Sequence, residues 1–102
     1  MKLLTKQIEK KMPGLGAQEH LMEKAIAHVK FFTPDSNWTW WASEFCPETE
    51  RFFGLVDGLE VEFGYFSLAE LQSVRGALGL PIERDLHFSP TDFETIKKGI
   101  ER

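Results

Sequence analysis

Three side chains suited to acid–base chemistry lie two residues apart near the end of the chain. Glu83, Asp85 and His87 would share one side of an extended segment, because alternate side chains of a strand point to the same face. An imidazole titrates near neutral pH and a carboxylate can orient it, so the three could serve a small hydrolase or nuclease. Charged side chains on an edge strand more commonly resist aggregation. We therefore keep the enzyme as an alternative, take Asp85 and His87 as candidate binding residues, and expect no catalytic residue, metal ligand or cofactor.

Two arginines could supply the electrophile that such an enzyme needs. Arg84 lies within the same segment, and Arg75 lies near the end of a predicted helix. A buried arginine usually pairs with a carboxylate of its own chain, for which Glu70, Glu83 and Asp85 are the candidates. Arg75 and Arg84 are therefore candidate binding residues, and an internal ion pair is their more common role.

Three tryptophans stand close together in a predicted strand. Trp38 and Trp40 fall on one face of that strand and Trp41 on the other. Strand aromatics can stack on the bases of a single-stranded nucleic acid while Arg or Lys contacts its phosphates. Tryptophan also fills the core of small sheets. Trp38 and Trp40 are therefore candidate binding residues, and nucleic-acid binding is an alternative function.

A hairpin is predicted around Asp57-Gly58, because both central positions of a two-residue type I′ turn need a positive φ. That turn would place Phe52 opposite Phe63, on a buried side that also holds Val61. The other side would combine apolar with acidic side chains, which favours a surface kept for a protein partner. The candidate docking residues on it are Phe53, Leu55, Glu60 and Glu62.

Hydrophobic periodicity and turn residues predict the element order α-β-β-β-β-α-β-α. Thr5 can N-cap the first helix, and Ser67-Leu68-Ala69-Glu70 forms a capping box for the second, which Gly76 would end. The expected ranges are helix 5–12, a linker 14–24 anchored by Leu15, Leu21 and Met22, strands 25–32, 38–45, 52–56 and 59–63, helix 67–76, strand 82–88, and a short C-terminal helix within 89–102.

These elements predict a single α+β domain over residues 1–102. Its mostly antiparallel sheet would have four to five strands, with two or three short helices packed on one face. The chain of 102 residues is too short for two independent cores.

Charge is unevenly distributed along the chain, whose formal net charge is −4. Residues 1–30 hold six Lys and three Glu, a net charge of +3, and residues 31–102 hold six basic and thirteen acidic side chains, a net charge of −7. The acidic part would repel a phosphate backbone. The one basic stripe, at Lys6, Lys10 and Lys11, is typical of a solvated helix face.

The cellular compartment follows from cysteine content and hydropathy. A single cysteine, Cys46, cannot form an internal disulfide and suits a reducing compartment. No uncharged run near the start is long enough for a secretory or membrane-spanning segment. We expect a cytoplasmic protein with no membrane partner.

Three blocks of sequence, at 29–40, 64–71 and 75–88, resemble the bacterial domain-of-unknown-function family 2958. The resemblance runs from Met1 to about Phe88, and residues 89–102 match no pattern of the family. It implies a short bacterial protein of the kind often found on plasmids and other mobile elements, and it brings no activity or catalytic residue. We therefore expect a cytoplasmic accessory protein that acts as a non-enzymatic binding module for a protein partner.

Overall fold

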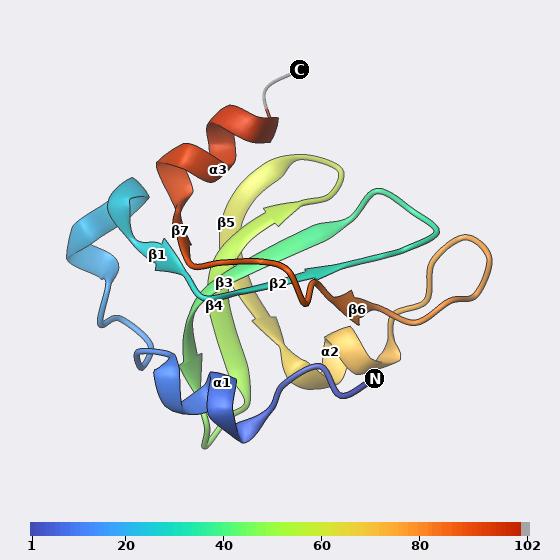
Figure 1. The fold of residues 1–102 in the computed structure, drawn as a ribbon, viewed down its shortest axis with the longest axis horizontal. Helices are drawn as coiled ribbons and strands as arrows, with labels where there is room; N and C mark the ends of the chain where they lie inside the picture. The colour runs from blue at the N-terminus through green and yellow to red at the C-terminus, as the bar shows by residue number, and fades with distance from the viewer. Residues whose placement is uncertain (101–102) are drawn as a thin grey trace.

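The computed structural model describes residues 1–100 and is organised around one antiparallel sheet (Figure 1). The sheet has five strands in the order β5-β4-β3-β2-β6, and β1 pairs with β7 in a separate two-stranded ladder. In chain order the elements are α1 (Lys6–Lys11), the 3₁₀ helix η1 (Glu19–Lys24), β1 (Ile26–Ala27), β2 (Val29–Phe32), β3 (Thr39–Cys46), β4 (Arg51–Asp57), β5 (Val61–Ser67), α2 (Leu68–Ser73), β6 (Glu83–Arg84), β7 (Thr91–Asp92) and α3 (Phe93–Ile100).

The α+β class and the antiparallel sheet are confirmed, and the described residues form a single domain. Helices pack on both faces of the sheet, however, whereas the sequence predicted helices on one face only. The last two residues of the expected C-terminal segment, 101 and 102, lie outside the described residues.

One face of the sheet, the α1/α2 face, carries the larger core. Phe31, Trp40 and Phe52 are buried there, and Phe52 stacks on Phe66 with ring centroids 5.3 Å apart. Both predicted helix starts are confirmed. The Thr5 hydroxyl accepts the amide of Ile8 at 3.2 Å, and the Ser67 hydroxyl accepts the amide of Glu70 at 3.0 Å. These caps satisfy amides that a helix leaves without a partner.

The opposite face, the α3 face, carries a second core. Trp41 and Leu55 of the sheet pack there with Phe93 and Ile96 of α3, and with Ala27 of β1. The Asp92 carboxylate accepts the amide of Thr95 at 3.0 Å and so caps α3. Trp40 and Trp41 are therefore buried on opposite faces, so that the centre of the sheet is covered on both sides.

The expected strand 25–32 is interrupted at His28, whose amide donates to the carbonyl of Ala42 at 2.8 Å. Before the break, Ala27 belongs to the α3-face core; after it, Val29 belongs to the α1/α2-face core. Both side chains are buried, as the alternation indicated. The alternation of apolar residues cannot show that Ala27 and Val29 belong to two different cores. A break in the strand at His28 changes the face on which they lie without changing that alternation.

The predicted register of the β4–β5 hairpin is wrong. Its loop contains three residues, 58–60, and the Gly58 amide donates to the carbonyl of Glu60 at 3.0 Å. Phe52 faces Phe66, whereas Phe63 faces Leu55 on the α3 face. The slip covers an odd number of positions, so each β5 side chain changes face. In the observed loop, the ring of Trp38 packs so closely against Gly58 that a Cβ would overlap it.

Three further local expectations are wrong. Gly76 does not end α2 in the left-handed region; the positive φ of 82° belongs to Gly79, and Gly76 packs against Asp35. The expected strand 82–88 pairs only at β6, because the chain turns away from the sheet edge after Arg84. The linker anchors Leu15, Leu21 and Met22 are exposed, and the buried residue of that segment is the polar Gln18.

Among residues 1–100, no helix combines the length and the apolar character needed to cross a lipid bilayer.

A pair of glycines that face each other across β4 and β5 provides a test of the fold. A Cβ at Gly54 would overlap the carbonyl of Trp41, whereas a Cβ at Gly64 would meet no atom within 4 Å. Gly54→Ala should therefore lower the free energy of unfolding by about 3 kcal/mol or more, because the backbone of β3 must move. Gly64→Ala should change it by no more than about 1 kcal/mol. Urea denaturation of both variants measures the difference, and equal effects would contradict this packing.

Candidate functional site

A half-open pocket of about 300 Å³ lies on the α3 face, beside the uncovered part of β4 and β5. Its aromatic wall consists of Phe53, Phe63 and Tyr65. The facing wall comes from the segment 16–25 and from Phe93 at the start of α3. The pocket thus joins the sheet to two segments that are far away in the sequence.

A β-bulge in β3 directs Glu44 into this pocket. Ala42 pairs with Gly54 and Glu44 pairs with Phe53, so Ser43 is an extra residue with no β4 residue directly opposite it in the register. An extra residue reverses the side on which every later side chain lies. Glu44 therefore lies on the α3 face with Phe53, although strict alternation would have placed it on the opposite face.

The buried Glu44 carboxylate holds the facing wall in place. Its Oε1 accepts the amide of Gly16 at 2.8 Å, and its Oε2 accepts the amide of Gln18 at 2.7 Å. The Gln18 side chain extends the link, since its Nε2 donates to the carbonyls of Ile26 and Ser43, both at 3.0 Å. Two buried polar side chains thus tie the segment before β1 to the sheet.

The three rings of the aromatic wall are packed together but partly open to solvent. Phe53 stacks nearly parallel on Phe63, with centroids 6.0 Å apart, and meets Tyr65 edge-on at 5.1 Å. Tyr65 is 59% exposed. Cations flank the wall, with Arg51 4.9 Å from the Tyr65 ring and Lys97 4.7 Å from the Phe63 ring.

The structure separates the four predicted docking residues. Phe53 lines the pocket, but Leu55 is 0% exposed beneath α3 and does not reach the surface. Glu60 lies in the hairpin loop, and Glu62 lies on the α1/α2 side of β5 because of the changed register. The residues that the sequence missed are Glu44, Phe63, Tyr65 and Gln18. The hairpin pattern gave the wrong face for Phe63 and did not reach Tyr65, and no local pattern indicated the role of Glu44 or Gln18.

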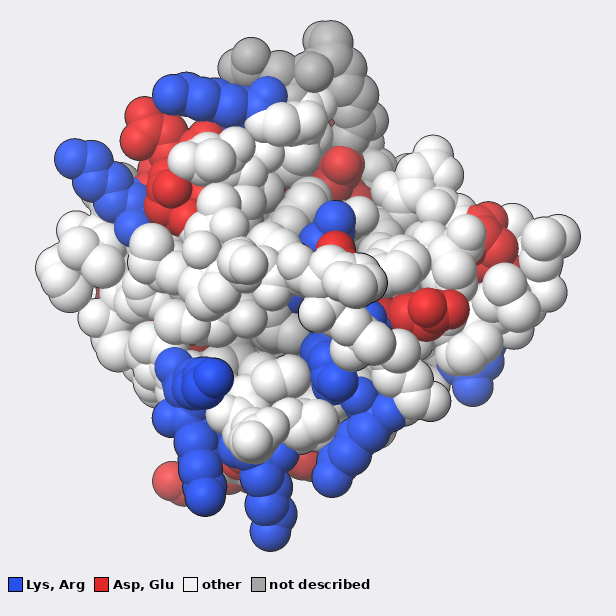
Figure 2. All heavy atoms as spheres, viewed as in Figure 1, with Lys and Arg blue, Asp and Glu red and all other residues white. Residues whose placement is uncertain are grey.

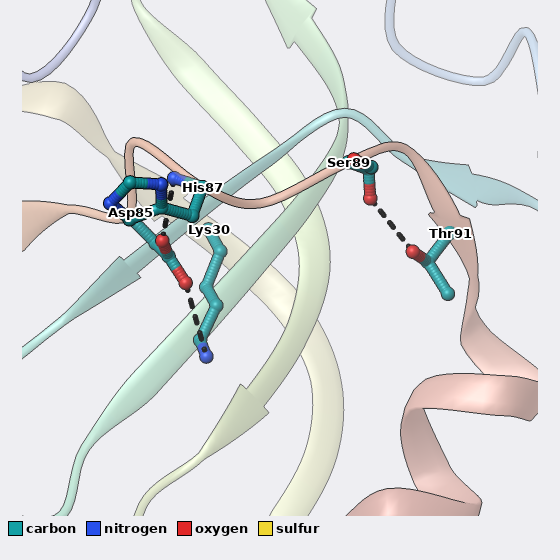
Figure 3. A network of polar contacts seen from close by, with 5 residues as sticks. All are labelled: Lys30, Asp85, His87, Ser89 and Thr91. Carbon is teal, nitrogen blue, oxygen red and sulfur yellow. Dashed lines mark hydrogen bonds and ion pairs between the residues drawn. The ribbon is translucent and has the colours of Figure 1, made fainter.

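A second hollow, of about 360 Å³, contains Glu83, Asp85 and His87. The Asp85 carboxylate forms an ion pair with Lys30 at 3.6 Å and accepts a hydrogen bond of 2.9 Å from His87 (Figure 3). That bond comes from the backbone amide of His87 and not from its imidazole. Asp85 therefore shapes a turn and does not orient the ring as a general base requires.

The two candidate arginines bond to backbone carbonyls, and within residues 1–100 neither of them forms an ion pair. Arg84 donates to the carbonyl of Lys2 at 2.6 Å and to that of Leu3 at 3.0 Å, and so fixes the N-terminal segment. Arg75 donates to the carbonyls of Gln72 and Val74 at 2.9 and 2.8 Å, which satisfies the end of α2. The expected carboxylate partners are thus replaced by backbone carbonyls.

The tryptophans do not form an open stacking platform. Trp40 is buried, and Trp38, which is 39% exposed, stacks on Trp40 with centroids 5.8 Å apart. The ring of Trp38 also packs closely against Gly58.

On the face drawn in Figure 2, charge is partly segregated. Lys and Arg side chains gather at the end of the molecule where α1 lies, and Asp and Glu appear mainly elsewhere (Figure 2). The carboxylates of Glu19, Glu23 and Glu44 line the aromatic pocket, and Glu23 pairs with Lys97 at 2.8 Å. Within residues 1–100, no three His, Cys, Asp or Glu side chains come together in a way that could hold a metal ion.

Three titratable groups outside this pocket have shifted pKa values. Burial lowers the pKa of the His28 imidazole. Hydrogen bonds from Thr49 lower the pKa of the Cys46 thiol, and hydrogen bonds from Thr95 lower that of the Asp92 carboxyl. All three shifts follow from local packing or capping.

Comparison with known proteins gives one match. A family model described as a protein of unknown function (DUF2958) matches residues 3–96. No curated protein and no solved structure matches the chain. The function must therefore be inferred from the surface of this chain.

Removal of the Glu44 carboxylate should open the pocket wall. Glu44→Ala should lower the free energy of unfolding by about 3 kcal/mol or more, because each hydrogen bond to a charged group contributes about 1.5–3 kcal/mol. The amides of Gly16 and Gln18 should also lose protection from hydrogen exchange. Glu48→Ala, at an exposed loop position, should change stability by no more than about 0.5 kcal/mol. Unchanged protection at Gly16 and Gln18 would disprove the role of Glu44.

His28 should make stability depend on pH. The unfolded chain binds a proton near the ordinary value of 6.5, whereas the folded chain, with its lowered pKa, binds it only at lower pH. The contribution of His28 is therefore complete above about pH 6.5 and is lost as the pH falls towards the folded pKa. Urea denaturation at about pH 7.5 and about pH 5.5 should show a smaller loss for His28→Gln than for the original chain. Identical losses would contradict this assignment.

Proposed function

We propose, for a chain that belongs to the DUF2958 family of proteins of unknown function, that it is a non-enzymatic binding module which docks a protein partner in the aromatic pocket of the α3 face. The observation that carries the proposal is the aromatic wall itself. Phe53, Phe63 and Tyr65 lie side by side on the sheet next to a half-open cavity. Partly exposed aromatic rings beside a cavity are typical of the anchor sites of protein interfaces.

The chemistry of the pocket indicates the kind of partner. An apolar or aromatic side chain would fill the cavity against Phe53 and Phe63. Glu19 on the pocket lining, together with Glu23, which is already paired with Lys97, favours Lys or Arg beside that anchor. We therefore propose a segment in which an apolar anchor is flanked by basic residues.

A protein partner suits this pocket better than a reacting substrate. Both Glu44 oxygens already accept backbone amides, and the Ser43 hydroxyl donates to the carbonyl of Phe53 at 3.3 Å. A general base or a nucleophile must be free to meet its substrate. The Glu44 carboxylate and the Ser43 hydroxyl are instead engaged in holding the walls of the pocket.

Single-stranded nucleic acid is the alternative that the flanking cations favour. Arg51 and Lys97 lie over Tyr65 and Phe63, as in surfaces that stack bases. Lys97, however, is paired with Glu23, and the same pocket contains further carboxylates that would repel phosphates. The balance of charge favours a basic protein segment.

The setting of this binding function is also part of the proposal. The resemblance of the three sequence blocks supports an accessory role on bacterial mobile elements. The single cysteine, Cys46, supports the cytoplasm as its compartment.

A photo-crosslinker in the pocket tests the partner directly. Phe53 is replaced with benzoylphenylalanine, an aromatic residue of related shape, and bacterial cells that carry the protein are irradiated. A discrete adduct with a second protein should form, and its yield should fall as salt is raised in a lysate, because salt screens the acidic pocket.

The control carries the same crosslinker at Leu59, which is 94% exposed in the hairpin loop. It should give no such adduct. An adduct that nuclease digestion removes would identify nucleic acid instead and overturn the proposal. Equal adducts from both positions, or none from Phe53, would do the same.

A further inference from the structure

Strand β5 is an unprotected edge of the sheet. It is seven residues long, and among the described residues it pairs only with β4. It contains no proline and no lysine, its only charged residue is Glu62, and its ladder with β4 has no bulge. Natural sheets usually protect an edge strand with a proline, with charged side chains such as lysine, or with a bulge, because free backbone groups can pair with another strand.

The opposite edge of the same sheet is blocked. Strand β6 is only two residues long, and both of them, Glu83 and Arg84, are charged. The N-terminal segment covers it, since the Arg84 amide lies 3.2 Å from the Met1 sulfur and the Arg84 guanidinium donates to Lys2 and Leu3 (Figure 1). Protection of one edge and not of the other indicates that the β5 edge is kept for pairing.

The ends of the β4–β5 ladder fix which backbone groups of β5 are free. The Gly58 amide donates to Glu60 at 3.0 Å, and the Leu68 amide donates to Glu50 at 2.9 Å. Hydrogen-bonded pairs alternate along an antiparallel ladder. Gly64, an even number of residues from both ends, therefore bonds to β4.

The alternate residues Val61, Phe63 and Tyr65 direct their N–H and C=O groups to the free edge. Their side chains are also the exposed apolar groups of the strand, at 41%, 36% and 59%. The same three residues thus offer backbone hydrogen bonds and apolar surface to an incoming strand.

We propose that β5 pairs antiparallel with β5 of a second copy of this chain, about a two-fold axis at Gly64. In this register, Phe63 of the first copy forms a hydrogen-bonded pair with Tyr65 of the second copy. By symmetry, Tyr65 of the first copy pairs with Phe63 of the second. Each of these pairs exchanges two N–H to C=O bonds. The two five-stranded sheets become one continuous sheet.

The strand sequence is complementary to itself in this register. Glu62 lies opposite Phe66 of the second copy, and Gly64 lies opposite Gly64, so no like charges of the strand itself face each other. On the α3 face, Phe53 and Tyr65 continue into Phe63 and Leu55 of the second copy as one apolar row. This strand carries only one carboxylate, that of Glu62, and so offers little charge to attract a basic peptide. Charge therefore favours the second copy as the occupant of the β5 edge.

The pairing stops at two copies, because a two-fold interface uses the same edge of both chains. The remaining edges of the joined sheet are the blocked β6 strands. The pairing also leaves the aromatic pocket accessible from the α3 face, so that this inference does not depend on the proposed partner.

Cysteine at the symmetry axis tests the register. Gly64 lies in a non-hydrogen-bonded pair of the new ladder, whose Cα atoms are about 4.5 Å apart, a distance that a disulfide spans. A Cβ at Gly64 meets no atom within 4 Å, so the chain should accept the change. Gly64→Cys should form a disulfide-linked dimer under mild oxidation. The original chain, with Cys46 alone, and Leu59→Cys should not.

Lysine at the same position tests the equilibrium. Sedimentation equilibrium at about 100 μM should show a dimer for the original chain, because a dimer with a Kd on the order of 1 μM is largely formed at that concentration. Gly64→Lys should be a folded monomer, since like charges would face each other across the axis. Leu59→Lys, with the same added charge in the exposed loop, should remain a dimer.

Several results would overturn the proposal. They are a monomeric original chain, a dimer that Gly64→Lys leaves intact, assemblies larger than two, or a Gly64→Cys chain that forms no more disulfide than Leu59→Cys. If Gly64→Lys fails to fold, the comparison of the two cysteine variants decides.

Discussion

The extra residue in β3 is the constraint on which both faces of the sheet depend. With Ser43 as that extra residue, Glu44 lies on the α3 face and Phe45 enters the α1/α2-face core. Without it, the carboxylate would enter an apolar core and the ring would face the pocket, and burial of an unpartnered carboxylate is costly. The bulge also explains Gly54, because the carbonyl of Trp41 passes over a position where no Cβ fits.

The position of Glu44 in turn determines where the surface is open. Its two hydrogen bonds hold the segment 16–18 beside the sheet, and Gln18 then fixes the start of β1. The chain therefore covers β3 on the α3 face but leaves part of β4 and β5 uncovered. The aromatic pocket and the free edge of β5 lie side by side for this reason, and both remain available for contact with other chains.

Charged side chains have two different uses in this molecule, at its surface and in holding its fold. The basic side chains lie mainly at the α1 end, while the pocket lining is acidic. At the other edge of the sheet, Arg84 and Asp85 look like functional groups in the sequence but serve the fold, since one fixes the N-terminal segment and the other a turn. Polar residue types alone do not distinguish these two uses.

Features that depend on near neighbours in the chain could be predicted from the amino-acid sequence. They are the caps at Thr5 and Ser67, the placement of Trp40 and Trp41 on opposite faces of a strand, and the α+β class, all of which follow from local hydrogen bonds and periodicity. The bulge, the hairpin register and the break at His28 are visible only in the folded chain. Each of these depends on contacts between distant segments, such as the bonds from Gly16 and Gln18 to Glu44 across 28 and 26 residues. A single added or displaced residue reverses the faces of a strand without changing its alternation, and therefore the pocket could be found only in the folded chain.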